Sequence, residues 1–102
     1  GSGDEKSICS LYGKYGLEHS EYSIWNLNGI GNLQRQQSPF SKNGKGLGIF
    51  DSNGDFKGHL HIDNSETNEF SKLLNYAWLD AKQSHSQTKQ NFCKLMRQKI
   101  GY

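Results

Sequence analysis

The sequence is poor in the residues that usually build a protein core. It has no valine, one proline and a hydrophobic content of only 32% in 102 residues, with a mean hydropathy of -0.86. No apolar run approaches the roughly 20 residues that a membrane-spanning helix needs, so we expect no membrane partner. The chain lies close to the lower limit of apolar content for a domain that folds alone. Five tyrosines, five phenylalanines and two tryptophans offset the shortage, because each aromatic ring buries a large area.

Cysteine is scarce as well. Cys9 and Cys93 are too few for the disulfide scaffold of a small secreted domain. One bridge between them would tie the two ends of the chain together, but the composition favours free thiols. No signal peptide is visible, and residues 1–3 (Gly-Ser-Gly) have the composition of a cloning remnant. Residues 4–102 are therefore expected to form a single domain.

Acidic residues are absent from Ala81 to the end of the sequence. The cations in that segment are Lys82, Lys89, Lys94, Arg97 and Lys99. A basic surface of this kind suits a polyanion such as a nucleic acid. An ordinary solvated helix face has the same pattern, so charge alone leaves both interpretations open.

Helical spacing of apolar residues occurs in three segments. Residues 4–15 show it weakly and stop at Gly16, which predicts a short N-terminal helix. Residues 70–81 show the clearest period, and residues 92–100 repeat it. The polar residues 83–88 are expected to separate these two C-terminal helices.

Alternating short runs indicate strands at residues 22–26, 30–37, 47–50 and 56–62. Between the last two runs, Asn53-Gly54 predicts a type I′ hairpin turn, in which both central residues have positive φ. Asp63 and Glu66 have the spacing of a capping box, with Asp63 as the N-cap of the following helix. The prediction is an α+β domain: a small antiparallel sheet of three to four strands, a β-meander, with an N-terminal helix and two C-terminal helices on one face.

Half of the four histidines lie on the second arm of the central hairpin. Because strand side chains alternate between two faces, His59, His61 and Lys57 would project from one face, where Arg35 could join them. Histidines titrate near neutrality, so His59 and His61 could serve as base and acid in metal-free RNA cleavage. Two solvated histidines with no catalytic role would give the same pattern.

The remaining parts of such a site can be named from the same stretch of sequence. Lys57 or Arg35 would hold the phosphate of the RNA, and Trp25 or Tyr22 would stack on a base. The basic C-terminal segment would add affinity that falls with salt. This hypothesis requires no cofactor.

The hairpin also resembles a known family. The segment Gly44-Lys45-Gly46-Leu47-Gly48-Ile49-Phe50-Asp51, then a glycine turn and Phe56-Lys57-Gly58, looks like the Gly-Leu-Gly, Asp, Gly, Lys-Gly hairpin of colicin-type cytotoxic ribonuclease domains. The resemblance implies a toxin of bacterial competition that cleaves tRNA or rRNA in the cytoplasm, is delivered within a larger secreted protein and is held by a cognate immunity protein. Residues 22–26 lack the histidine and acidic residues of that family, so no catalytic residue is carried over.

Two other functions stay open. The His59-Leu60-His61 strand is similar to the metal motif of HUH endonucleases, with Asp51 or Asp63 as a third ligand. Those enzymes need a tyrosine nucleophile, for which the candidates are Tyr76 and Tyr102. Alternatively, the chain is a non-catalytic protein-interaction or sensor module, which meets its partner through the helix of residues 70–81 or an edge strand near Gln34.

Overall fold

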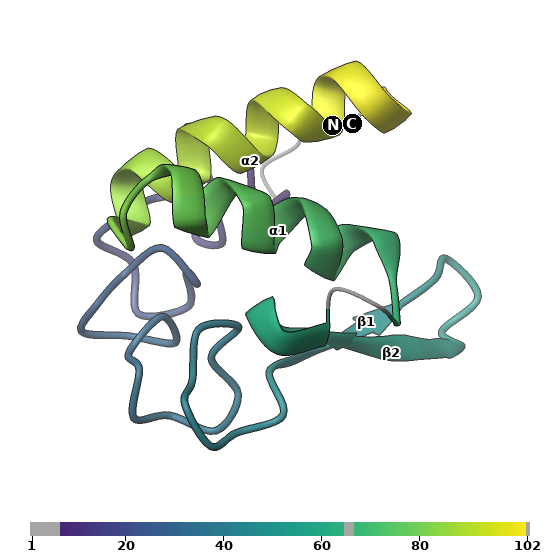
Figure 1. Ribbon diagram of the computed structural model, residues 1–102, viewed down its shortest axis with the longest axis horizontal. Helices are drawn as coiled ribbons and strands as arrows, with labels where there is room; N and C mark the ends of the chain where they lie inside the picture. Colours follow the sequence, from purple (N-terminus) through teal and green to yellow (C-terminus); the bar gives the residue numbers. More distant parts are fainter. Residues whose placement is uncertain (1–6, 65–66, 102) are drawn as a thin grey trace.

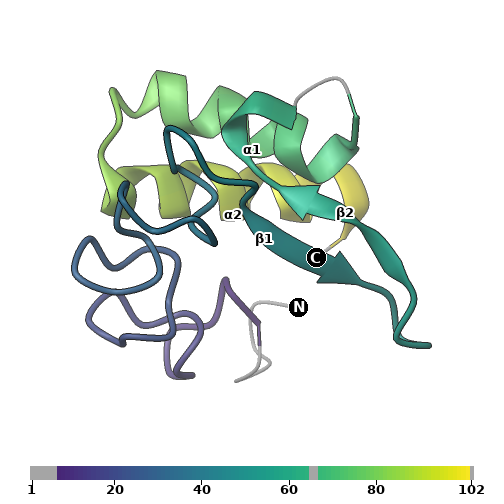
Figure 2. The same cartoon turned by 90° about the horizontal axis from the view of Figure 1, so that it is seen from below.

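The computed structural model describes residues 7–64 and 67–101. The regular elements are strands β1 (Leu47–Phe50) and β2 (Phe56–Leu60), a 3-10 turn η1 (Ile62–Asn64), and helices α1 (Glu69–Asp80) and α2 (His85–Ile100). The two helices lie side by side, with the hairpin beneath α1 at one end (Figure 1). Residues 7–46 form an irregular segment beside the hairpin (Figure 2).

Both C-terminal helices are confirmed. In α1 the predicted period buries Leu73, Leu74, Ala77 and Trp78. In α2 it buries Phe92 and Met96, and Gly101 ends the helix in the left-handed conformation, with φ of 70°. The helix starts earlier than expected, at His85, because the Ser84 side chain accepts the N–H of Gln87 as an N-cap.

The expected cap of α1 is wrong. Its N-cap is Asn68, whose side-chain oxygen accepts the N–H of Ser71 at 2.7 Å. Asp63 lies instead in η1, and Glu66 lies outside the described residues. An N-cap must lie directly before the first turn of its helix. Asp63 cannot cap α1, because it lies in η1 and α1 begins only at Glu69.

The α+β class holds, but the predicted sheet and helix count are wrong. In the described residues the sheet has only two antiparallel strands and there are two α-helices. Residues 22–26 and 30–37 form turns instead of strands, and residues 7–15 form turns and bends instead of a helix. The hairpin is therefore the whole sheet, and no meander precedes it.

A chain of successive turns in residues 17–41 explains these differences. From Ser20 to Ser41, the N–H of every third residue donates to the carbonyl three positions earlier. The residues at these positions are Ser20, Ser23, Asn26, Gly29, Asn32, Arg35, Ser38 and Ser41. Most of the serine and asparagine side chains also accept the N–H two positions later. Short polar side chains thereby take backbone donors that a helix or sheet would need.

Aromatic rings fill the core, as the shortage of aliphatic residues predicts. Phe40 and Trp78 stack with ring centroids 4.4 Å apart, and Trp25 packs against both Phe40 and Phe92. The Trp25 indole N–H donates to the carbonyl of Ile8 at 2.7 Å. The turn chain thus contributes Trp25 and Phe40 to the same core that the helices line.

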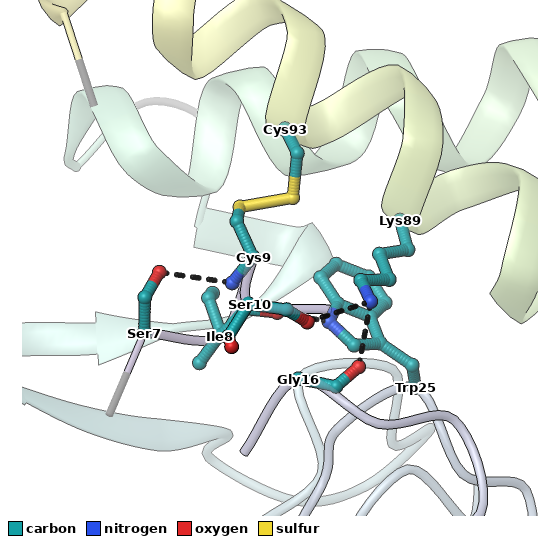
Figure 3. The surroundings of a disulfide bond; sticks show 8 residues. All are labelled: Ser7, Ile8, Cys9, Ser10, Gly16, Trp25, Lys89 and Cys93. Atoms are coloured by element: carbon teal, nitrogen blue, oxygen red, sulfur yellow. Dashed lines mark hydrogen bonds between the residues drawn. A yellow bond between two sulfur atoms is a disulfide. The ribbon is translucent and has the colours of Figure 1, made fainter. Parts of the chain in front are cut away.

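Cys9 and Cys93 form a disulfide, contrary to the expectation of free thiols. Beside it, the Lys89 ammonium is buried and donates to the carbonyls of Ser10 at 3.1 Å and Gly16 at 2.7 Å (Figure 3). Burial lowers the pKa of Lys89, and the negative charge of Glu18 partly opposes that shift. These bonds fasten the irregular N-terminal half to α2.

Replacing both cysteines, Cys9→Ala with Cys93→Ala, should lower the free energy of unfolding by about 2–5 kcal/mol, because the bridge restrains a long loop of the unfolded chain. Urea denaturation measures this loss. Reduced wild-type protein is the matched control and should unfold at the same urea concentration as the double variant. An unchanged midpoint in both would contradict a structural role for the bridge.

Candidate functional site

The tip of the hairpin differs from the predicted type I′ turn. The N–H of Asp51 donates to the carbonyl of Asp55, so the ladder continues past the assigned strands. The Asp51 carboxylate accepts the N–H groups of Asn53 and Asp55 at 2.9 and 3.0 Å. Positive φ occurs at Gly54 and not at Asn53. The result is a three-residue connection, Ser52 to Gly54, with glycine in the left-handed conformation. The Asp51 carboxylate holds this connection, whereas the Asn-Gly rule for two-residue turns considers only the turn residues themselves.

A bulge in β2 changes which side chains share a face. Gly48 pairs with His59 and Phe50 with Phe56, so Ile49 opposes two residues, Lys57 and Gly58. Gly58 has φ of 107°, which a residue with a side chain rarely adopts. One extra residue shifts the two-residue alternation, so Lys57 and His59 no longer share a face as expected.

The bulge produces an aromatic strip made of Phe50, Phe56 and His59. The Phe56 ring lies 5.5 Å from the Phe50 ring and 5.0 Å from the His59 ring, with both contacts edge to face. Phe50 is 61% exposed and Phe56 is 53% exposed, although both are large apolar side chains. The strip is therefore a solvent-facing surface of the hairpin.

His61 lies beyond the end of β2 and is only 3% exposed. Its Nδ1 accepts the backbone N–H of Asp63, so the proton of the neutral ring is on Nε2, which donates to the Ser41 carbonyl at 2.7 Å. The side chain thus ties the loop before β1 to the end of β2. His59 and His61 do not lie on a common exposed face, and their catalytic role stays a prediction.

The other candidate residues are also dispersed. Trp25 is 2% exposed in the core, whereas Tyr22 is on the surface with the Lys14 ammonium 4.9 Å from its ring centroid. Arg35 is exposed in the turn chain. Lys57 pairs with the Asp51 carboxylate at 3.7 Å across the hairpin. Their roles in RNA binding remain predictions, but Trp25 would have to leave the core to stack on a base.

Metal ligands do not gather around the hairpin. Within residues 7–64 and 67–101, no group of three or more histidine, cysteine, aspartate or glutamate side chains could hold a metal ion. The imidazole of His61 is already engaged on both nitrogens. The described residues therefore offer no support for the metal-dependent alternative.

A cleft of about 560 Å³ lies along α2, in the basic C-terminal segment for which the sequence predicted salt-dependent affinity but no particular binding site. It is called the α2 cleft below, and its lining residues are Cys9, Leu11, Glu18, Gln87, Lys89, Gln90, Asn91, Cys93, Lys94 and Arg97. Glu18 is the only acid among them. Gln87, Gln90, Lys94 and Arg97 succeed one another at helical spacing, which places them on one face of α2. That spacing, together with the missing acids, was the available sequence signal.

His85 attaches the start of α2 to the turn chain. It is buried, its Nε2 donates to the Gly31 carbonyl at 2.8 Å, and its ring meets Phe40 and Trp78 edge to face. Its Nδ1 has no hydrogen-bond partner in the described part of the chain. Burial lowers the pKa of His85, since protonation would place an unpaired N–H and a charge in the core.

No family model, curated protein or solved structure matches this chain. Neither of the α-helices found in the described residues is long and apolar enough to cross a membrane. Function must therefore be inferred from the hairpin and the α2 cleft themselves.

Acid should destabilise the fold through His85. The unfolded chain protonates this side chain near its ordinary pKa of 6.5, whereas the folded chain does so only at lower pH. The contribution of His85 is complete above pH 6.5 and is lost as the pH falls toward the lowered pKa. Urea midpoints measured from neutral to acidic pH should show a smaller drop for His85→Gln, whose amide can still donate to Gly31. An equal drop in both proteins would exclude His85 as the cause.

Proposed function

We propose that the protein is a nucleic-acid-directed module that binds single-stranded RNA in the α2 cleft. The observation that carries this proposal is that two exposed cations, Lys94 and Arg97, line the α2 cleft, whereas Glu18 is the one acid in its lining. Lys94 and Arg97 are exposed, and neither side chain has a hydrogen bond or ion pair within the described residues. They are therefore available to phosphate groups.

The spacing of these groups suits an extended strand. Along the helix axis, Gln90 and Lys94 are about 6 Å apart and Lys94 and Arg97 about 4.5 Å apart, at about 1.5 Å per residue. The cations would meet successive phosphates, and the free amide of Gln90 could hydrogen-bond a base edge. Lys89 also lines the cleft and adds positive charge, although its ammonium group already donates to the carbonyls of Ser10 and Gly16.

The size of the cleft favours a single strand over a duplex. Its volume of about 560 Å³ is that of a small-molecule site, which admits unstacked nucleotides and excludes a double helix. Tyr12, next to the lining residue Leu11, is 81% exposed and could stack on a base. Stacking of this kind tolerates any base, so we expect weak sequence preference.

Cleavage is a separate hypothesis. His59 remains partly exposed, but it lies in the aromatic strip and not among the residues that line the α2 cleft. RNA cleavage, a toxin role and an immunity partner therefore remain predictions that are separate from the proposed RNA binding. The disulfide favours a route through an oxidising compartment, which agrees with a delivered protein.

A protein-interaction function is the second candidate. One observation favours it, namely the exposure of Phe50 and Phe56 on the hairpin. Aromatic side chains are enriched at the centres of protein interfaces. This surface is distinct from the α2 cleft, so the two functions are compatible.

The test is fluorescence anisotropy of a labelled single-stranded RNA over a range of salt concentrations, with EDTA present. Lys94→Gln with Arg97→Gln should weaken binding roughly tenfold, because two contacts of about 0.7 kcal/mol each amount to about 1.4 kcal/mol. The slope of log affinity against log salt should fall by about 1.4, which is two phosphates at about 0.7 each. Lys42→Gln with Lys72→Gln removes the same charge outside the cleft and is the matched control.

Equal weakening by the control pair would show that only net charge matters, and it would overturn the α2 cleft as the site. Absence of binding at low salt would overturn nucleic-acid binding altogether. Running the same samples on a gel separates binding from cleavage. Fragments that disappear in a His59→Ala variant would support the catalytic hypothesis.

A further inference from the structure

The free edge of β1 presents unpaired backbone groups. Antiparallel ladders alternate between residues that bond to the partner strand and residues whose N–H and C=O point away. Since Asp51 bonds to Asp55, the next pair, Phe50 with Phe56, is of the second kind. After the bulge, Gly48 with His59 is again of that kind. Gly48 and Phe50 therefore direct their backbone groups away from β2.

At the end of the hairpin away from its turn, the backbone groups that point outward from the ladder have hydrogen-bond partners. The N–H of Gly46 donates to the Gln36 carbonyl at 3.0 Å, which closes the β1 edge at its start. On β2, the His59 carbonyl accepts from three side chains, and the His61 N–H donates to the Ser71 hydroxyl. The three donors to His59 are Asn64, Asn68 and Ser71.

Gly48 and Phe50 have no such protection within the described residues. No turn, loop or side-chain hydrogen bond in those residues reaches their N–H or C=O groups. An exposed strand edge of this kind is a template for pairing with another strand. The segment of β1 from Gly48 to Phe50 is therefore available for pairing with another strand.

We propose that this segment of β1 pairs antiparallel with the same segment of a second copy of the chain, about a two-fold axis. Gly48 of one copy then faces Phe50 of the other, and the reverse pairing follows from symmetry. Each of these pairs exchanges two backbone hydrogen bonds. The pairing stops at Gly46, where Gln36 occupies the edge.

Charge complementarity makes a second copy the fitting partner. Lys45 precedes β1 and is exposed, whereas Asp51 and Asp55 follow it at the hairpin tip. Lys57 pairs with Asp51, so Asp55 supplies the negative charge that has no ion pair within the described residues. Antiparallel pairing brings the basic start of one β1 toward the acidic tip of the other. Opposite charges at both ends favour this alignment, while a parallel alignment would place like charges together.

The aromatic strip gains from the same pairing. Phe50 of one copy would lie opposite Gly48 of the other. The Phe50 and Phe56 rings of that other copy already cover Gly48, so the incoming Phe50 would pack against those rings. The two strips then form one surface across four strands. A sheet of three or more strands is more stable than an isolated two-stranded hairpin, so each copy stabilises the other. Because the pairing is short, the dimer should dissociate on dilution.

Sedimentation velocity over a wide range of concentrations tests the dimer. Wild-type protein should shift from monomer to dimer as concentration rises, and Phe50→Lys should stay monomeric at every concentration. Leu79→Lys is the matched control, because Leu79 on α1 is also 61% exposed but lies outside the hairpin. It should dimerise like wild type.

Amide hydrogen exchange tests the edge directly in the unmodified protein. The Gly48 and Phe50 amides should exchange more slowly at high concentration, whereas the Gly46 amide, already bonded to Gln36, should not change. A monomer at all concentrations would overturn the proposal. So would a dimer that Leu79→Lys disrupts or that leaves the Gly48 and Phe50 amides unchanged. The Lys94→Gln with Arg97→Gln variant should dimerise normally, since RNA binding and dimerisation use different residues.

Discussion

The attachment of the irregular segment, residues 7–46, to α2 is the constraint on which the rest of the structure depends. Residues 7–46 contain no helix or strand, and their hydrogen bonds are mostly local. Besides the packing of Trp25 on Phe92, one covalent bond and two sets of hydrogen bonds fasten this segment to α2: the Cys9–Cys93 disulfide, the Lys89 bonds to two carbonyls, and the His85 bond to Gly31. If these bonds were absent, the local turns and core packing alone would have to keep Trp25 and Phe40 in place.

This attachment also creates the α2 cleft. One wall is the irregular segment near Leu11 and Glu18, and the other is the polar face of α2. Both cysteines line the cleft, so the same bond that stabilises the fold fixes the position of the wall. The hairpin lies apart from this attachment, and its base half is held by Ser71, Asn68 and His61. Two separate surfaces therefore remain available for binding.

The helices could be predicted from sequence because a single apolar face decides them. The period in residues 70–81 is set by burial, and no polar side chain competes with it. The strands expected at residues 22–26 and 30–37 failed for the opposite reason. Serine or asparagine at six of the eight positions spaced by three residues, from Ser20 to Ser41, diverts the backbone into turns. The strand prediction considers only the two-residue period of apolar side chains and not this three-residue period of polar ones.

The expected common face of Lys57, His59 and His61 is not formed, whereas the roles predicted for these residues remain predictions. The alternation that placed Lys57 and His59 on one face assumes a regular strand, and Gly58 inserts a bulge between them. His61 is separated from His59 for another reason, because it lies beyond the end of β2 and its buried ring bonds to Ser41. A glycine within a strand can mark a bulge, but its effect on register depends on the partner strand. The disulfide likewise depends on a tertiary contact between Cys9 and α2 that no local pattern encodes.

Amide hydrogen exchange before and after reduction of the disulfide tests the central claim most directly. After reduction, the amides that form the turn chain, such as those of Ser23 and Asn26, should lose protection more than the amides in the middle of α1. This result would show that attachment to α2 orders the N-terminal half. Protection of the turn chain that survives reduction unchanged would contradict the claim and would show that its local hydrogen bonds and core packing are sufficient.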